Sequence, residues 1–237
     1  MSDAAADTPA GDPRFRRVRG HVTSRRASRS FEYVLLLIGV SFVFAATAPD
    51  AAWATSVLVL VQSANLVVAL WTSGLSRAGA RRNIVFLALA VVLAAAGIVW
   101  TGPKLTAALS IISALLTFAI IAVIALTVVS KGEVDRQAIT GAICVYLLVG
   151  MVFVFVYGAM AALGSGPFFA QGTDGTRALR VYFSYVTLAT LGYGDYTPAG
   201  NLGHTLAVVE ALLGQLYLVT VVALLVARVR PARARQD

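Results

Sequence analysis

Six long apolar stretches constrain this chain more than any other feature of its sequence. They cover Phe31–Ala48, Ala52–Thr72, Asn83–Thr101, Leu105–Ser130, Ala138–Leu163 and Gly203–Ala227. A helix of about 20 apolar residues crosses a hydrocarbon layer of about 30 Å, and inside lipid a helix satisfies all of its backbone hydrogen bonds within one segment. The composition agrees, because 59% of the residues are hydrophobic and only 13% are charged. The sequence therefore predicts an all-α membrane protein with six transmembrane helices.

The distribution of basic residues predicts how these helices are oriented. All but three of the 19 Lys and Arg residues lie in the two tails or in the loops after the second and fourth stretches, and the exceptions are Lys104, Arg177 and Arg180. Basic residues concentrate in the cytoplasmic segments of membrane proteins, so both termini are expected in the cytoplasm. They are almost all arginine, as in GC-rich bacterial genomes, so the bacterial cytoplasmic (inner) membrane is the expected location.

The net charge of +8 follows this topology and does not indicate a nucleic-acid partner. The first 30 residues are polar and rich in Ala, Asp, Pro, Arg and Ser, so they are predicted to be disordered rather than to form a secretory signal peptide. Their arginines could contact anionic lipid headgroups, and each would contribute about 1 kcal/mol near the surface. For the tail as a whole, a role in orienting the chain in the membrane is preferred over binding of a specific partner. Cys144 is the single cysteine, and no nucleophile, metal or cofactor motif indicates an enzyme.

The motif Thr-Leu-Ala-Thr-Leu-Gly-Tyr-Gly-Asp, at residues 187–195, stands between the fifth and sixth stretches. A shorter helix, roughly Ala178–Thr190, is predicted before the sixth stretch, and its last residues are the first residues of this motif. Glycine tolerates left-handed backbone, so Gly192 and Gly194 allow an extended segment of alternating handedness that turns successive carbonyl oxygens to one side. Non-helical backbone at membrane depth is tolerated only where protein buries it or where it lines a water-filled cavity. The motif therefore predicts a re-entrant helix and loop beside a cavity.

The segment Tyr182–Pro198, YFSYVTLATLGYGDYTP, resembles the pore loop of the tetrameric potassium channel family. The order Thr-x-x-Thr-x-Gly-Tyr-Gly-Asp between two membrane helices carries the resemblance, which is strong from about residue 137 to 230 and only topological upstream. It implies a selectivity filter, in which backbone carbonyls replace the water around a dehydrated potassium ion. The filter residues would be Thr190, Leu191, Gly192, Tyr193 and Gly194, with K+ held at the first four and no other cofactor. Leu191 departs mildly from the family, which usually has Val or Ile there.

The resemblance also implies residues that support this filter. Thr187 and Asp195 would support it, and the hydroxyl of Tyr182 is the candidate hydrogen-bond partner of Asp195. Val186 stands where some family members have a Glu, so this chain cannot form that carboxylate pair. Because one chain supplies one filter strand and a ring needs four, a homotetramer is expected.

Two residues of the last apolar stretch are further candidates. Glu210 is an ionisable residue inside the membrane and is therefore a candidate functional residue. We prefer a role in which it bonds to Ser184 or Thr187 and supports the filter from behind, over direct contact with the ion. Gly214 matches the family's inner-helix hinge glycine, but a glycine in an apolar helix also permits close packing, and the two roles are weighted equally. The residues expected to line the cavity and the lower pore recur at helical spacing and are Gln215, Leu218, Val222 and Val226.

The four upstream stretches lack the features of a voltage sensor. Such a sensor needs Arg or Lys at every third residue of its fourth helix, whereas Leu105–Ser130 contains no charged residue. Voltage gating by a charged fourth helix is therefore not supported, and a packing and assembly module is preferred. Gln62, Ser63 and Asn65 in the second stretch are predicted to form interhelical hydrogen bonds rather than a ligand site.

The predicted organisation has five parts: a disordered basic cytoplasmic tail (1–30), a four-helix transmembrane module (31–130), a cytoplasmic linker (131–136), a pore domain (137–228) and a short basic tail (229–237). The linker spans only about 9 Å even as a helix, so a tetramer without domain swapping is expected. The preferred function is passive, potassium-selective conduction. A poorly selective cation channel and a non-conducting regulatory subunit of a larger channel are the alternatives.

Overall fold

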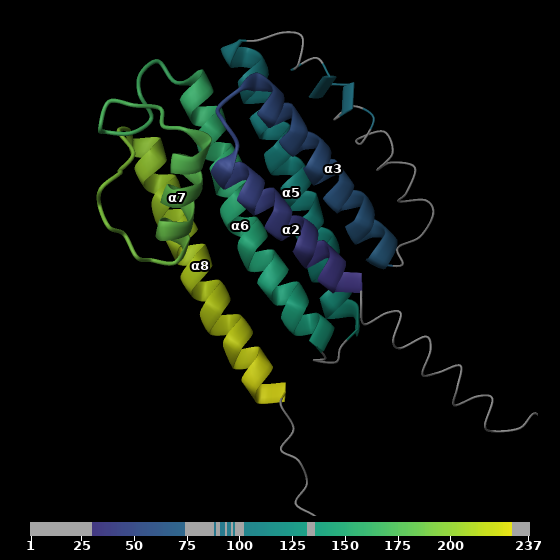
Figure 1. Ribbon diagram of the computed structural model, residues 1–237. Coiled ribbons are helices and arrows are strands. Elements are labelled where there is room, and N and C mark those ends of the chain that lie inside the picture. Colours follow the sequence, from purple (N-terminus) through teal and green to yellow (C-terminus); the bar gives the residue numbers. More distant parts are fainter. Residues whose placement is uncertain are drawn as a thin grey trace, which may run out of the picture.

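The computed structural model describes residues 30–73, 102–131 and 136–228, together with Ala88, Val91, Val92, Ala94, Ala95 and Gly97. The helices named in these ranges are α2 (Ser30–Thr47), α3 (Ala52–Ser73), α5 (Pro103–Lys131), α6 (Arg136–Leu163), α7 (Arg177–Leu188) and α8 (Asn201–Arg228) (Figure 1). The described residues contain only isolated β-bridges outside the helices, so the all-α prediction is confirmed for them. Most helix ends fall within two residues of the predicted ones, because hydropathy changes sharply where a chain leaves an apolar environment.

Four of the described helices are long and apolar enough to cross a membrane. Their apolar segments are Trp53–Ser73, Pro103–Val129, Gln137–Leu163 and Asn201–Val221, and that of α2, Phe31–Thr47, is shorter. The predicted third stretch, Asn83–Thr101, lies mostly outside the described residues. So do the two tails and the linker residues 132–135. The chain is therefore a multi-pass membrane protein, and the full count of six spans stays a prediction.

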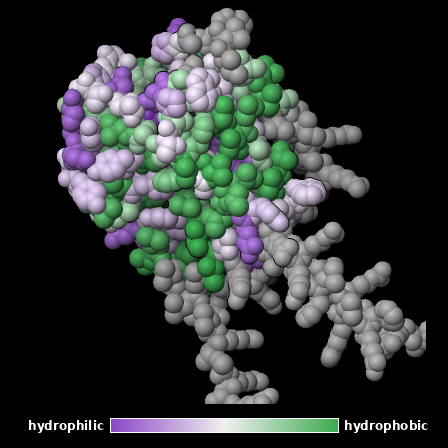
Figure 2. Space-filling view, in the orientation of Figure 1, coloured by the Kyte–Doolittle hydropathy of each residue, from purple (hydrophilic) through white to green (hydrophobic). Residues whose placement is uncertain are grey.

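The helices place the predicted filter motif at one end of the bundle. The start of α2 and the end of α8 both lie toward the lower side in Figure 1, while α7 and the segments on either side of it lie toward the opposite, upper side. After α7 the chain returns to that upper end, where α8 begins. Hydrophilic residues gather over this part of the surface, and hydrophobic residues cover much of the neighbouring helices (Figure 2).

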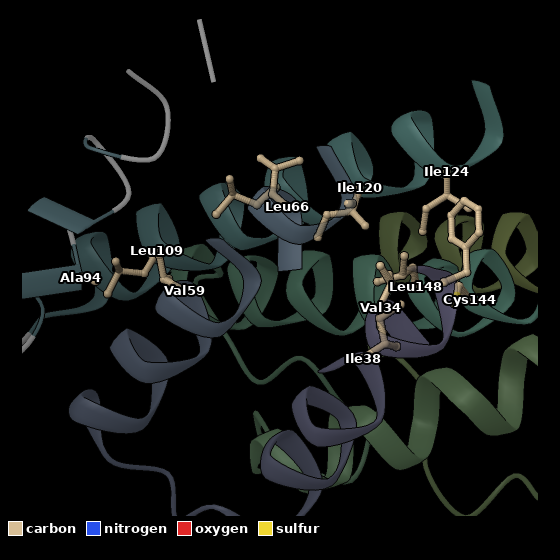
Figure 3. Packing of buried hydrophobic residues seen from close by; sticks show 13 residues of the cluster. Val34, Ile38, Val59, Leu66, Ala94, Leu109, Ile120, Ile124, Cys144 and Leu148 are labelled. Atoms are coloured by element: carbon tan, nitrogen blue, oxygen red, sulfur yellow. The ribbon is translucent and has the colours of Figure 1, made fainter. Parts of the chain in front are cut away.

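One hydrophobic core joins the upstream helices to α6. Val34 and Ile38 of α2 and Ile120 of α5 are buried against Cys144 and Leu148 of α6 (Figure 3). Cys144 is a free, buried thiol, as its place in an apolar stretch indicated. The α2–α5 module therefore packs on the α6 helix of its own chain.

The three polar residues near the middle of α3, Gln62, Ser63 and Asn65, are buried, but of these three only Asn65 has a hydrogen bond to another described helix. Asn65 donates from Nδ2 to Ser41 Oγ of α2 at 2.9 Å, which confirms the predicted interhelical hydrogen bond for Asn65. Gln62 and Ser63 are equally buried, yet Gln62 Nε2 and Ser63 Oγ have no partner among the described residues. The prediction is therefore confirmed for one residue of the three.

Candidate functional site

Helix α7 leads directly into the filter motif. It begins after Thr176, whose hydroxyl accepts a hydrogen bond from Leu179 N at 3.1 Å, and it ends at Leu188. The sequence had placed its end at Thr190, two residues later. The helix stops earlier because Thr190 has a φ of 56°, outside the right-handed region. The amides of Thr190 and Leu191 close the last turn on the carbonyls of Thr187 and Val186, both at 2.9 Å.

The backbone of the filter motif alternates in handedness. Thr190, Gly192 and Gly194 have φ values of 56°, 53° and 77°, while Leu191 and Tyr193 between them have no positive φ. The left-handed conformation predicted for both glycines is therefore present. Thr190 was not expected to share it, since a non-glycine residue in this region stores about 1–3 kcal/mol of strain. Leu191 and Tyr193 are 58% and 67% exposed in the single chain, so this segment is open to further contacts.

Tyr182 and Asp195 are joined just beyond the glycines. The Tyr182 hydroxyl donates to Asp195 Oδ2 at 2.8 Å, so the expected bond is present. The hydrogen bond to Asp195 raises the pKa of Tyr182 to about 12, because it stabilises the protonated phenol. The rings of Tyr182 and Tyr193 also stack, with centroids 6.4 Å apart and an interplanar angle of 6°. One tyrosine of α7 thus contacts two residues of the motif.

Glu210 lies at the meeting point of three helices. Its side chain is fully buried, and Oε2 accepts a hydrogen bond from the Tyr157 hydroxyl of α6 at 2.6 Å. Ser184 Oγ of α7 lies within hydrogen-bond distance of both Glu210 Oε1 and the Gly150 carbonyl oxygen of α6, the latter at 2.9 Å, and its one proton serves one of these acceptors at a time. Of the two partners predicted for Glu210, Ser184 is therefore present. The sequence analysis did not identify Tyr157. A buried carboxyl group needs more than one hydrogen-bond donor, and α6 has few donor side chains, so this need was a signal that could have identified Tyr157.

Gly214 lies where α8 crosses the end of α7. A Cβ atom at this position would come within 2.2 Å of the Leu188 carbonyl oxygen and 3.0 Å of its carbonyl carbon. Real Cβ atoms do not approach backbone this closely, so only glycine fits. Close packing, one of the two roles considered for Gly214, is therefore present, while the hinge role stays a prediction.

The predicted lining residues are only partly described. Gln215 and Leu218 are exposed on α8, on the surface that does not face α6 and α7 of the same chain. The side chains of Val222 and Val226 lie outside the described residues. Thr187, predicted to support the filter, is half-buried in α7.

A pair of substitutions tests whether Glu210 braces this junction. Glu210→Gln should be tolerated, because the amide can accept from Tyr157 and donate to Ser184 Oγ, whose own proton then goes to the Gly150 carbonyl. Glu210→Ala should lower the thermal stability of the assembled protein, because the buried Tyr157 hydroxyl loses its acceptor, at a cost of about 1–3 kcal/mol in each subunit. Melting of the purified protein in detergent measures both. Equal melting temperatures for the two variants would show that the hydrogen bonds contribute nothing.

Comparison with known proteins agrees with this geometry. Residues 141–230, which cover nearly all of α6 and all of α7 and α8, match the family described as ion channel. Over 83 residues the chain is 37% identical to the inward rectifier potassium channel Kirbac3.1 of Paramagnetospirillum magnetotacticum, a match that covers 35% of this chain and 26% of that protein. Over 56 residues it is 45% identical to the probable potassium channel protein 2 of Methanocaldococcus jannaschii, covering 22% of this chain and 16% of that protein. No solved structure matches significantly.

Proposed function

We propose that this chain is one subunit of a homotetrameric, potassium-selective channel, because residues 141–230 match the family described as ion channel. The observation that carries the proposal is the left-handed backbone at Thr190, Gly192 and Gly194, directly after α7, which packs against α6 and α8. The two relatives bear the names of potassium channels, and the matched parts make up 26% and 16% of their lengths. The activity of the whole chain is thus our inference.

In the proposed mechanism, K+ sheds its water and is held by backbone carbonyls of Thr190, Leu191, Gly192 and Tyr193 from four subunits. The exposure of this strand in a single chain supports such an assembly, because the other three strands would cover it. The carboxy-terminal end of α7 carries a partial negative charge, and it would favour the cation on the inner side of the filter. Glu210 would act on the ion only indirectly, by holding α7 against α6 and α8.

We place six spans in the bacterial inner membrane, with α7 and the filter as a re-entrant segment. The common end shared by the start of α2 and the end of α8 supports the placement of both termini in the cytoplasm (Figure 1). The arginines of the amino-terminal tail would lie near anionic headgroups. With no charged residue from Leu105 to Ser130, the upstream module has no gating charges to move.

Ion flux from liposomes that contain only this chain tests the proposed function. Potassium and rubidium should pass far better than sodium, and barium should block, because a rigid ring of carbonyls fits the larger dehydrated ions. Comparable sodium and potassium fluxes would favour the poorly selective cation channel instead. The absence of any flux from correctly assembled protein would favour the regulatory subunit.

The arrangement of subunits is a separate prediction. Only residues 132–135 separate the end of α5 from the start of α6, and α5 packs along α6 of the same chain. We therefore expect each α2–α5 module to rest beside the pore helices of its own chain. An electron cryo-microscopy map of the tetramer, traced through residues 131–136, measures this directly. A module that rests on the pore helices of the next chain would contradict the prediction.

A further inference from the structure

The start of α7 carries charges of an unfavourable sign. The first N–H groups of a helix have no partner within the helix and create a partial positive charge. The first turn of α7 nevertheless contains Arg177 and Arg180 and no acidic residue. Its own capping residue, Thr176, satisfies only the N–H of Leu179. This helix end therefore needs a negative charge from elsewhere in the fold.

Asp50 supplies that charge from the turn between α2 and α3. Its two carboxylate oxygens accept the backbone N–H of Arg177, Oδ1 at 2.9 Å and Oδ2 at 3.1 Å. The neighbouring Thr55 of α3 accepts from Arg177 Nη2 at 3.2 Å, and the Arg177 side chain is only 6% exposed. Burial lowers the pKa of Arg177, and the charge of Asp50 opposes that change. Asp50 thus caps the helix end and offsets part of the cost of burying the arginine.

The same upstream helices continue along the side of α7. Val181 of α7 is buried in one cluster with Ala45 of α2 and Leu58 of α3. One turn further, the rings of Phe42 and Tyr185 meet edge to face with centroids 4.9 Å apart. Helix α7 has only 12 residues and is about 18 Å long, and its last residue, Leu188, stands two residues before Thr190.

We propose that Asp50 is a positioning residue for the filter: from the upstream module it holds the outer end of α7, and so keeps Thr190–Gly194 in the conducting arrangement. The inference rests on the proposed function and gives the α2–α5 module, whose segment Leu105–Ser130 has no charged residue, a task in it. Without the Asp50 carboxylate, the Arg177 N–H loses its acceptor and two arginines remain at the positive end of the helix. Loss of such a cap should shift the balance between conducting and non-conducting filters by about 5- to 30-fold.

The test compares D50A and D50N with D174N in the full-length tetramer. Asp174 lies in the segment just before α7, but its carboxylate accepts from Phe168 N rather than from α7, so D174N removes one charge near the same helix end and leaves the cap intact. Three quantities are measured: rubidium flux per assembled tetramer, the potassium-to-sodium permeability ratio, and amide hydrogen exchange at residues 177–179. D50A should lower the rubidium flux and the potassium-to-sodium permeability ratio, and it should speed amide hydrogen exchange at residues 177–179. D174N should resemble the unmutated protein in all three measurements. D50N keeps an acceptor oxygen and should be intermediate.

A rescue variant distinguishes positioning from general damage. In D50A/A178D a carboxylate returns to the first turn of α7 itself, and conduction should recover in part although the contact with the upstream module stays broken. Assembled D50A that matches D174N in flux, selectivity and exchange would overturn the proposal. If D50A does not assemble, D50N decides in the same way: a lowered flux supports the proposal, and a flux equal to that of D174N overturns it. Failure of the unmutated protein to conduct would contradict the proposed function instead, and hydrogen exchange would still test the cap.

Discussion

Gly214→Ala is expected to abolish conduction and to disrupt the pore domain. The added Cβ would lie 2.2 Å from the Leu188 carbonyl oxygen, and backbone cannot move aside as a flexible side chain can. Helices α7 and α8 would have to separate at the point where α7 leads into Thr190. Overpacking of this kind typically costs about 1–3 kcal/mol per site, and a tetramer contains the site four times. Potassium flux and the fraction of protein that runs as a tetramer measure the effect.

Gly39→Ala is the matched control for this substitution. Gly39 also lies inside a helix, α2, but a Cβ there would meet nothing within 4 Å. Alanine is favoured over glycine in a helix by about 1 kcal/mol, so this variant should assemble and conduct normally. The experiment also separates the two roles considered for Gly214. A hinge role alone predicts an assembled tetramer with altered gating, whereas the packing role predicts loss of the folded pore.

Alanine at Gly192 or at Gly194 is the second substitution expected to abolish conduction. A Cβ at either position would meet nothing within 4 Å in the single chain, so the effect comes from the backbone rather than from a collision. The φ values of 53° and 77° are left-handed, and each costs an L-residue about 1–2 kcal/mol. The strand can escape this strain by turning its carbonyls away from the ion path. Rubidium flux in liposomes measures the loss.

Gly200→Ala controls for the removal of a glycine from the same loop. Gly200 has no positive φ, and a Cβ there would also meet nothing within 4 Å. This variant should therefore conduct like the unmutated protein. Normal conduction by Gly192→Ala and Gly194→Ala would show that the left-handed backbone is not required.

Sequence periodicity and motif order predicted most of the local structure. The helix bounds follow from hydropathy, because a helix in lipid must be apolar along its length. The left-handed glycines follow from residue type, and the bond between Tyr182 and Asp195 follows from the family resemblance. Ser184 was found as a partner of Glu210 because both positions could be placed on facing helices.

The contacts that sequence reasoning missed join residues far apart in the chain. Asp50 lies between the first two apolar stretches, and nothing in the sequence around it indicates a partner 127 residues away. Tyr157 looked like one more aromatic residue in an apolar helix. The left-handed Thr190 was missed for another reason, since residue type argues against that conformation and only the surrounding structure can impose it.

The shared core of α2, α5 and α6 has a consequence for how the protein is made. Helices α2–α5 leave the ribosome before α6, so a finished partner is already in the bilayer when α6 is inserted. The side of α6 that carries Cys144 and Leu148 then meets protein instead of lipid (Figure 3). A pore domain synthesised without its upstream helices would leave this side facing lipid and the start of α7 without its carboxylate. The upstream helices would thus act as a template on which the rest of the chain assembles during translation.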